Sequence, residues 1–265
     1  MSVGRAVRDR VAAQSAMAEV LQRQRGVPKR GALARLLGFS PLLPSARSSY
    51  RDALAELVVG DILENLGHNW DVLHDVPLGD TTLDHLLIGP AGTFAIRAAH
   101  YGERDVVVTG NEVTVGSEHP TDLAHTIDQA EAVEAHLSAI SPQHVTVRPV
   151  LAVVAPRRLV IRSEPGAVDV LVANDLSRHF ARAPRTLSGA EVAAISDLAD
   201  LESTWDAPAE GSLQVQDLHA TFGLIRQEVR AARLRRVALG SIAAAIGLVA
   251  LWTFVAQTTS LLLTH

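Results

Sequence analysis

Hydrophobic residues in the middle of the chain alternate between helical spacing and short strand-like runs. Between about residues 48 and 66 they recur every three or four positions, which predicts a helix with one apolar face. That face consists of Leu54, Leu57, Val58, Ile62 and Leu66. Ser49 and Asp52 have the spacing of a capping pair, so we expect the helix to begin at Ser48 or Ser49.

Five shorter apolar runs follow, each with the length and the flanking turn residues of a strand. They cover residues 70–76, 83–88, 93–96, 105–109 and 112–115. The turn Gly89-Pro90-Ala91-Gly92 separates the second run from the third, and Gly110-Asn111 joins the last two as a hairpin. A group of strands joined by short turns is therefore expected directly after the first helix.

Helices and strands continue to alternate beyond the hairpin. Residues 121–139 have helical spacing and are expected to cover the sheet. Buried strands are predicted at residues 145–154 and 158–161, and residues 168–172 then lead into a helix from about Asn174. Ser188 and Glu191 predict a capping box for a further helix. Its inward face is expected to comprise Val192, Ile195, Leu198 and Leu201. This order predicts an α/β domain with a mixed central sheet flanked by helices.

The longest uncharged stretch of the chain covers residues 237–263. It follows a break at residues 205–212 and a helical segment from about Leu213. Residues 237–256 are its most apolar part, long enough for a helix to cross a hydrocarbon layer about 30 Å thick. Five arginines precede it: Arg226, Arg230, Arg233, Arg235 and Arg236. The positive-inside tendency therefore predicts a single-pass, tail-anchored protein of the inner (cytoplasmic) membrane, with the N-terminal domain in the cytoplasm.

The N-terminal region is basic and has a thin apolar stripe. Residues 1–25 are compatible with a helix, and residues 26–46 read as a Gly- and Pro-rich linker with a short helix at 32–37. Two interpretations of this linker stay open. Basic residues beside apolar ones favour contact with anionic lipid headgroups, whereas a solvated tether explains the same composition. The residues concerned are Lys29, Arg30, Arg35, Leu36, Leu37 and Phe39.

These patterns divide the chain into four parts. We predict a basic helical arm and linker (1–47), an α/β domain with a C-terminal helical extension (48–204), a linker with a juxtamembrane basic helix (205–236) and a transmembrane helix (237–263). Small residues at four-residue spacing in the last part are compatible with a homodimer. They are Gly240 with Ala244 and Ala243 with Gly247.

The net charge of −5 conceals a strong asymmetry along the chain. Residues 1–50 carry nine Lys or Arg against two acids, residues 51–216 ten against twenty-five, and residues 217–265 five against two. Affinity for nucleic acid depends largely on neutralising phosphates, so the acidic middle disfavours nucleic acid as its partner. The absence of cysteine excludes disulfides, thiolate metal sites and a cysteine nucleophile.

Asp84 leads into one predicted strand, and the strand after it is where metal-dependent phosphodiesterases carry an acid-x-Lys triplet. In that arrangement the carboxylates hold Mg²⁺ and the lysine helps to orient the attacking water. From about residue 53 to 137 the chain resembles the nuclease-related domain (NERD) family, a branch of the restriction-endonuclease-like PD-(D/E)xK fold. The resemblance rests on Ala55-Glu56, the run from Trp70 to Pro77, Leu83-Asp84-His85, the run from Ile88 to Gly92, Ile96 and His100-Tyr101.

The resemblance implies a catalytic set that this chain matches only in part. Glu56 and Asp84 match the helix acid and the first strand acid, but Arg97 stands at the second acid position and Ala99 at the lysine position. No lysine occurs after Lys29. We therefore expect a pseudoenzyme that needs no cofactor and acts as a binding or scaffold module. Arg97 is expected to pair with Asp84 or Glu56 and to occupy the place of a divalent metal.

Other interpretations remain. Glu56 and Asp84 would hold Mg²⁺ or Mn²⁺ if the domain is an active nuclease with atypical partners. The basic N-terminal arm is an alternative electrostatic site for nucleic acid. A metal cluster is less favoured, because Asp84 and His85 are adjacent and point to opposite faces of a strand. Its members would be His74, Asp75, Asp84, His85 and His100. The family resemblance and the Ala-, Arg- and Val-rich composition indicate a bacterial source.

Overall fold

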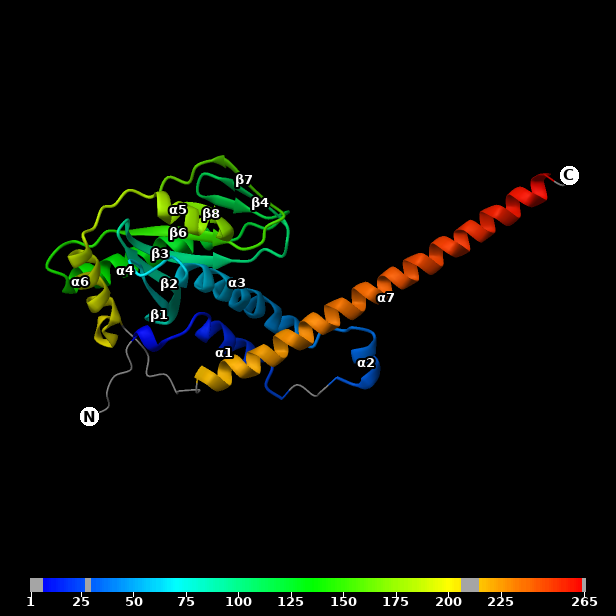
Figure 1. Cartoon of the computed structure of the whole chain (residues 1–265), viewed down its shortest axis with the longest axis horizontal. Helices are drawn as coiled ribbons and strands as arrows, with labels where there is room; N and C mark the ends of the chain where they lie inside the picture. The colour runs from blue at the N-terminus through cyan, green and yellow to red at the C-terminus, as the bar shows by residue number, and fades with distance from the viewer. Residues whose placement is uncertain (1–6, 27–29, 206–214, 264–265) are drawn as a thin grey trace. The chain divides into compact units, whose positions relative to one another are not determined.

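The chain is described by a computed structural model that covers residues 7–26, 30–205 and 215–263 (Figure 1). It divides into two compact units. The first comprises residues 1–20 and 48–218, and the second comprises residues 21–47 and 219–265. The division differs from the four parts drawn from the sequence, because the N-terminal region contributes to both units.

The first unit is built on a five-stranded mixed sheet in the order β1-β2-β3-β6-β8. β1, β2 and β3 are antiparallel neighbours, whereas β3, β6 and β8 run parallel. The strands are β1 (Asp71–Leu78), β2 (Thr81–Gly89), β3 (Gly92–Ala99), β6 (Val147–Val153) and β8 (Asp169–Val172). The predicted α/β class with a mixed central sheet is confirmed.

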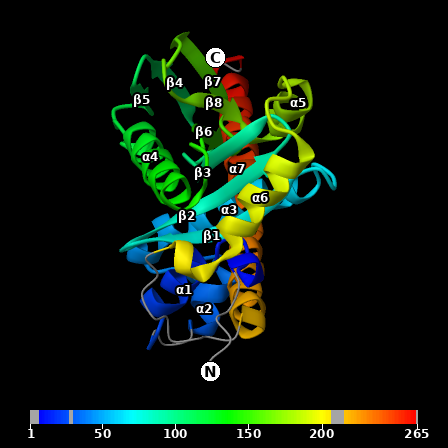
Figure 2. The same cartoon turned by 90° about the vertical axis from the view of Figure 1, so that its left-hand side faces the viewer.

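Helices cover both faces of this sheet, so its central strands are buried on both sides. One face packs against α4 (Asp122–Ile140) and α6 (Gly189–Asp200), the latter crossing β2 (Figure 2). The other face packs against α3 (Arg47–Glu64) and α5 (Leu176–Arg182), which follows the short 3₁₀ turn η3 (Ala173–Asp175). Along β2, Leu86 and Ile88 belong to the first core, and Leu87 belongs to the second.

Gly89 ends β2 at a position where no side chain fits. A Cβ on Gly89 would lie 2.1 Å from Cε3 of Trp70, far inside van der Waals contact. Trp70 in turn packs against Phe180, with ring centroids 5.4 Å apart and the ring planes tilted by 53°. The turn from Gly89 to Gly92 predicted from the sequence therefore serves packing as well as chain reversal.

A second, three-stranded sheet has the order β5-β4-β7. It contains β4 (Asp105–Thr109), β5 (Glu112–Thr114) and β7 (Arg158–Ser163), and Gly110 in the predicted hairpin turn has φ 54°. The prediction that residues 158–161 form a buried strand is wrong. β7 lies at the edge of this small sheet, paired only with β4 among the described strands, and Ile161 is 38% exposed.

Two helix ends differ from their predictions. α3 begins at Arg47, directly after the 3₁₀ turn η2 (Pro44–Ala46), so Ser49 is a buried residue within the helix and not its cap. The capping box of Ser188 and Glu191 is confirmed at the start of α6. The inward face of α6 is narrower than predicted, because Leu201 lies beyond the helix and is 51% exposed. The short 3₁₀ turn η4 (Glu202–Thr204) follows it.

Residues 7–20 are integral to the first unit. They form the 3₁₀ turn η1 (Val7–Asp9) and most of α1 (Gln14–Arg23), and they bury Val7, Met17 and Val20. Asp75 of β1, which has φ 52° and is 1% exposed, anchors them. Its carboxylate accepts hydrogen bonds from Arg10 Nη2 at 2.6 Å, the Ser15 backbone N at 3.0 Å and Ser15 Oγ at 2.9 Å.

The second unit contains α2 (Ala32–Leu36) and most of α7 (Val215–Leu263), which runs from orange to red in Figure 1. The predicted short helix at 32–37 is thus confirmed. α7 contains a segment, Asp217–Trp252, that is long and apolar enough to cross a membrane, and the most apolar part of it is not buried. The predicted helix start at Leu213 and most of the predicted break at 205–212 lie outside the described residues.

Candidate functional site

A polar cavity of about 470 Å³ lies where β2 and β3 separate. It brings together all four residues that the sequence singled out: Glu56 of α3, Asp84 of β2, and Arg97 and Ala99 of β3. Four further acids line it: Glu19, Asp52, Glu118 and Asp122. Its remaining charged residues are Arg51 and Arg104. With every carboxylate ionised, six acids would face three arginines.

The side chain of Asp84 accepts a hydrogen bond from a backbone amide of β3 at the point where β2 and β3 diverge. The pairing of β2 with β3 runs from Gly89 and Gly92 to His85 and Ile96. One step further, Asp84 Oδ2 accepts a hydrogen bond from the backbone N of Ala98 at 2.7 Å. Burial raises the pKa of Asp84 to about 6, although nearby Arg97 and this hydrogen bond favour the charged form. The carboxylate thus has a structural role, because it links β2 to β3 beyond the end of their backbone pairing.

Glu56 is the second buried carboxylate of the cavity and is 7% exposed. Burial raises its pKa well above the usual value, and Asp84, Asp75 and Asp52 add to the effect. Asp52, one helical turn earlier on α3, also has a raised pKa because of burial. These acids favour the protonated form more than ordinary carboxylates do.

Arg97 forms its ion pair with Asp122, at the start of α4, and not with Asp84 or Glu56 as we predicted. Its Nε lies 3.0 Å from Asp122 Oδ1. The second oxygen of Asp122 accepts a hydrogen bond from the hydroxyl of Tyr101 at 2.8 Å. Asp84 still interacts with Arg97 electrostatically, since the two face the same cavity. The reason is geometric: Asp122, the first residue of α4, is the acid within ion-pairing distance of the Arg97 guanidinium.

Ala99 contributes only a methyl group to the cavity wall and is 5% exposed. The lysine that the family resemblance places there would have supplied a cation within reach of a substrate phosphate. The nearby cations are arginines engaged in other contacts. Arg104 lies 2.9 Å from Glu118 through Nη2 and donates from Nε to the carbonyl of Tyr101 at 2.7 Å.

Glu56 and Asp84 are the carboxylates that would hold a divalent metal in this cavity. Within residues 7–26, 30–205 and 215–263, no three His, Asp or Glu side chains are grouped as metal ligands. Asp84 already accepts the Ala98 amide, and the pKa values of Glu56 and Asp84 are both raised. Metal binding would require both carboxylates to be deprotonated, and it would leave Oδ2 of Asp84 shared with the Ala98 amide.

The histidines serve structural roles beside this cavity. His74 Nδ1 lies 2.8 Å from His85 Nδ1, and His74 Nε2 lies 3.1 Å from Glu64. Burial lowers the pKa of both histidines, so they pack as neutral rings. His100 Nδ1 accepts a hydrogen bond from the Gly102 amide at 2.9 Å. His74 and His85 are not among the residues that line the Asp84 cavity.

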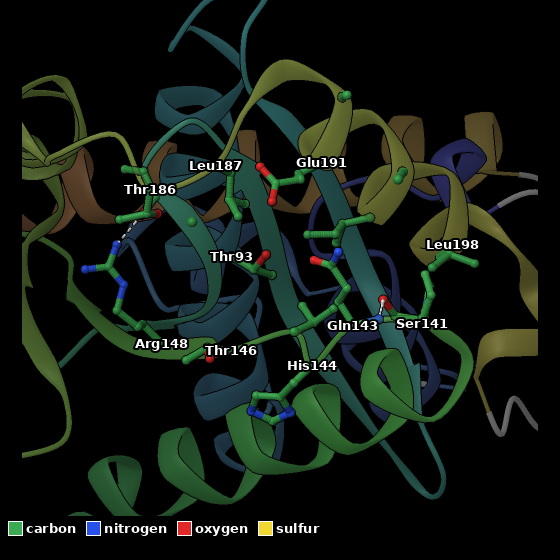
Figure 3. Close-up of a pocket in the computed structure, with 17 residues that line it drawn as sticks. Thr93, Ser141, Gln143, His144, Thr146, Arg148, Thr186, Leu187, Glu191 and Leu198 are labelled. Carbon is green, nitrogen blue, oxygen red and sulfur yellow. Dashed lines mark hydrogen bonds between the residues drawn. The ribbon is translucent and has the colours of Figure 1, made fainter.

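A second cavity of about 590 Å³ lies between α6, the β2–β3 turn and the loop after α4 (Figure 3). Its walls are mostly apolar and include Leu187, Ile195 and Leu198. Arg148 stands at one side, where its Nη2 donates to the carbonyl of Ala91 at 2.6 Å and its guanidinium lies 4.2 Å from the centre of the Phe94 ring. None of the sequence-predicted site residues lines this cavity.

Comparison with known families identifies the domain that contains the Asp84 cavity. Residues 51–154 match the family model described as the nuclease-related domain. No curated protein and no solved structure matches the chain. The matched range extends from the first residues of α3 to the end of β6, and it includes Glu56, Asp84, Arg97 and Ala99. The mixed sheet is compatible with a restriction-endonuclease-like fold. The chain therefore combines a segment, residues 51–154, that is similar to the nuclease-related domain with a helix long enough to cross a membrane.

Proposed function

We propose that this protein is a membrane-anchored pseudoenzyme, whose nuclease-related domain acts as a binding or scaffold module without cleaving nucleic acid. The ion pair between Arg97 and Asp122 is the observation that supports this proposal most directly. It fixes a cation on the strand where the family resemblance places a metal-binding acid. Two residues further, Ala99 has no group that could orient water or stabilise a developing charge.

Electrostatics also argue against turnover. Phosphodiester cleavage at such a site requires metal ions to offset the charge between acidic residues and an anionic substrate. With every carboxylate ionised, the cavity has six acids against three arginines and, without a bound metal, would repel a phosphate backbone. The acidic surroundings of the cavity, ten basic against twenty-five acidic residues over 51–216, act in the same direction.

Proximity of the two family acids supports the alternative, a metal-dependent nuclease with atypical partners. Glu56 and Asp84 line one cavity, and Asp52 lies one helical turn from Glu56. In that case the carboxylates would hold Mg²⁺ or Mn²⁺. Cleavage assays separate the two functions because a scaffold does not turn over.

We infer the membrane topology from α7 and from the arginines that precede its uncharged stretch. Five arginines occupy residues 226–236, and the uncharged stretch begins at Val237. Under the positive-inside tendency, the nuclease-related domain then lies on the cytoplasmic face of the inner membrane of a bacterium, with a single span. The arginines near the span are suited to anionic lipid headgroups.

The deciding experiment is a cleavage assay on the full chain in detergent. Single- and double-stranded DNA and RNA are incubated with Mg²⁺ or Mn²⁺, with the Asp84→Ala variant as a matched control. We expect no cleavage above the level of this variant. Metal-dependent cleavage that Asp84→Ala abolishes would establish the nuclease instead. A parallel gel-shift series at rising salt tests electrostatic nucleic-acid binding by the basic N-terminal region.

Restoring the acid-x-Lys triplet tests whether positions 97 and 99 correspond to the metal-binding acid and the lysine of the nuclease pattern. The double variant Arg97→Asp with Ala99→Lys restores the acid-x-Lys triplet, and calorimetry measures its affinity for Mn²⁺. We expect measurable binding in the double variant and none in the unmodified chain. Mn²⁺ binding by the unmodified chain that disappears in Asp84→Ala would contradict the pseudoenzyme. The single variant Ala99→Lys is the control, because it adds the cation without a metal ligand.

A further inference from the structure

The largest exposed apolar side chains near the N-terminus lie together on α2 and the residues after it. Leu33 is 68% exposed, Leu36 67%, Leu37 43% and Phe39 56%. α2 itself, Ala32–Leu36, buries no residue. Four adjacent exposed side chains of this size indicate a contact surface, because soluble proteins rarely gather them without a partner.

This apolar cluster is fixed to α7 by backbone contacts. A Cβ on Gly38 would lie 2.6 Å from the carbonyl oxygen of Ala232 and 2.8 Å from the backbone N of Arg236. Gly38 also has φ +69°, so only glycine suits both the conformation and the close approach. The segment from Arg30 to Phe39 is therefore seated on α7.

Polar contacts hold the same segment in register. Arg235 Nη1 and Arg236 Nη2 each donate a hydrogen bond at 3.1 Å, to the carbonyl oxygens of Arg35 and Gly38 respectively. Arg30 Nη2 lies 2.7 Å from Glu228 Oε2. The contacts on α7 thus extend from Glu228 to Arg236.

The apolar span of α7 begins one residue beyond these contacts, at Val237. An α-helix rises about 1.5 Å per residue, so Glu228 lies about 13 Å along the axis from Val237 and Arg236 lies within about 2 Å of it. Interfacial helices bury their apolar face about 5–10 Å into the boundary between headgroups and acyl chains. α2 lies beside α7 (Figure 1), and Gly38 approaches Ala232 and Arg236, so the cluster is near the level where a bilayer around the span would present that boundary.

We propose that residues 30–39 form an interfacial contact with the lipid bilayer that surrounds α7. Leu33, Leu36, Leu37 and Phe39 insert beside the span. The surrounding arginines bind anionic headgroups: Arg35, Arg233, Arg235 and Arg236. Lipid is favoured over a protein partner because the cluster is continuous with a membrane-spanning segment and is bordered by cations on both elements. This inference rests on the membrane anchoring proposed above and is independent of the Asp84 cavity.

A single-cysteine label on the full chain tests the contact, because the natural sequence has no cysteine. Leu36→Cys is labelled with a fluorophore and reconstituted into vesicles that contain phosphatidylglycerol and a nitroxide lipid quencher. Leu201→Cys is the matched control, since Leu201 is an exposed leucine of the first unit. We expect the nitroxide lipid to quench the label at position 36 several-fold more strongly than the label at 201. Equal quenching at the two positions, with equal access to a water-soluble quencher, would overturn the proposal.

Two further measurements separate lipid from other occupants. Quenching at position 36 should not depend on the protein-to-lipid ratio. If shielding of the label instead grows with protein density, a second copy of this chain covers the cluster and the lipid contact is refuted. Replacing phosphatidylglycerol by phosphatidylcholine should weaken the quenching. Unchanged quenching would overturn the role assigned to the arginines.

A substitution of Gly38 tests whether the lipid contact depends on the packing of residues 30–39 against α7. In the Leu36→Cys background, Gly38→Val places a branched side chain against Ala232 and should displace residues 30–39. We expect the lipid quenching to fall toward the level of the Leu201 control. Gly26→Val is the matched control, because Gly26 also has positive φ but nothing lies within 4 Å of its Cβ position. Retained quenching in Gly38→Val would contradict the docking that positions the cluster.

Discussion

β2 and β3 are neighbours in one sheet, yet they differ in what they retain of the nuclease-related pattern. β2 keeps Asp84, whose carboxylate accepts the Ala98 amide, whereas β3 carries Arg97 and Ala99 at the positions of an acid and a lysine. The Asp84 carboxylate makes a hydrogen bond that joins β2 to β3. The side chain of Arg97 instead contacts Asp122 of α4, and Ala99 has only a methyl group. Under the proposed loss of activity, Asp84 would still be required for its hydrogen bond between β2 and β3.

The first prediction concerns the hydrophobic core to which both β2 and β3 contribute. Leu86 of β2 is completely buried between the sheet and α4 and α6. Leu86→Ala should lower the free energy of unfolding by about 2–5 kcal/mol, because it removes buried methyl groups and leaves a cavity. Urea denaturation in detergent, followed by tryptophan fluorescence, measures the change.

Leu201→Ala is the matched control for that experiment. Leu201 is a leucine with half of its surface exposed, so its truncation should cost less than about 0.5 kcal/mol. A loss for Leu86→Ala no larger than that of this control would show that the two cores described above do not carry the stability of the domain.

The second prediction concerns the retained acid. The folded pKa of Asp84 is about 6, above its ordinary value of 3.8, so the folded chain binds its proton more tightly than the unfolded chain does. The contribution of Asp84 to stability should therefore increase as pH falls from about 7 to about 4, by at most about 3 kcal/mol. The measurement compares the urea midpoint across this range in the unmodified chain and in Asp84→Asn.

The difference between the two pH profiles isolates Asp84 from the histidines. His74 and His85 have lowered pKa values, so they destabilise the fold on acidification and act in the opposite direction in both proteins. The difference curve should be flat below about pH 3, where Asp84 is protonated in both the folded and the unfolded chain. A difference that does not vary with pH would refute the raised pKa of Asp84.

The third and smallest effect is the coupling energy between Arg97 and Asp122. A double-mutant cycle with Arg97→Ala and Asp122→Ala should give a coupling energy of about 0.5–2 kcal/mol, because both side chains are partly exposed. Coupling between Arg97→Ala and Asp84→Ala should be smaller, since Asp84 is bonded to the Ala98 amide. The reverse order would restore the pairing first predicted from the sequence.

Local pattern predicted the framework of this domain well. The strands at 70–76, 83–88 and 93–96 and the capping box at Ser188 follow from spacing within a few residues, and the structure contains them. Exposure of β7 was not predictable in this way. A short apolar run is compatible with a central or an edge strand, and only the arrangement of the sheets decides between them.

The cavity was predictable only in part. Glu56, Asp84, Arg97 and Ala99 came from motif spacing, and the structure brings them together. Asp52 and Asp122 were missed as members of the cavity. Asp52 lies four residues before Glu56 on the same helix, a signal that was available from the sequence. Asp122 lies at the far end of a loop from β3, and its contact with Arg97 depends on how α4 packs on the sheet.

The division of the chain between its two units has a consequence for proteolysis. The polypeptide passes from one unit to the other three times, after residues 20, 47 and 218. A single cut between residues 205 and 215 would therefore not release the nuclease-related domain from α7. Residues 21–47 would still link the domain covalently to α2, which remains fastened to α7 by the contacts of Arg30, Arg235 and Arg236. Such a nicked protein should remain with the membrane until a denaturant separates its two fragments.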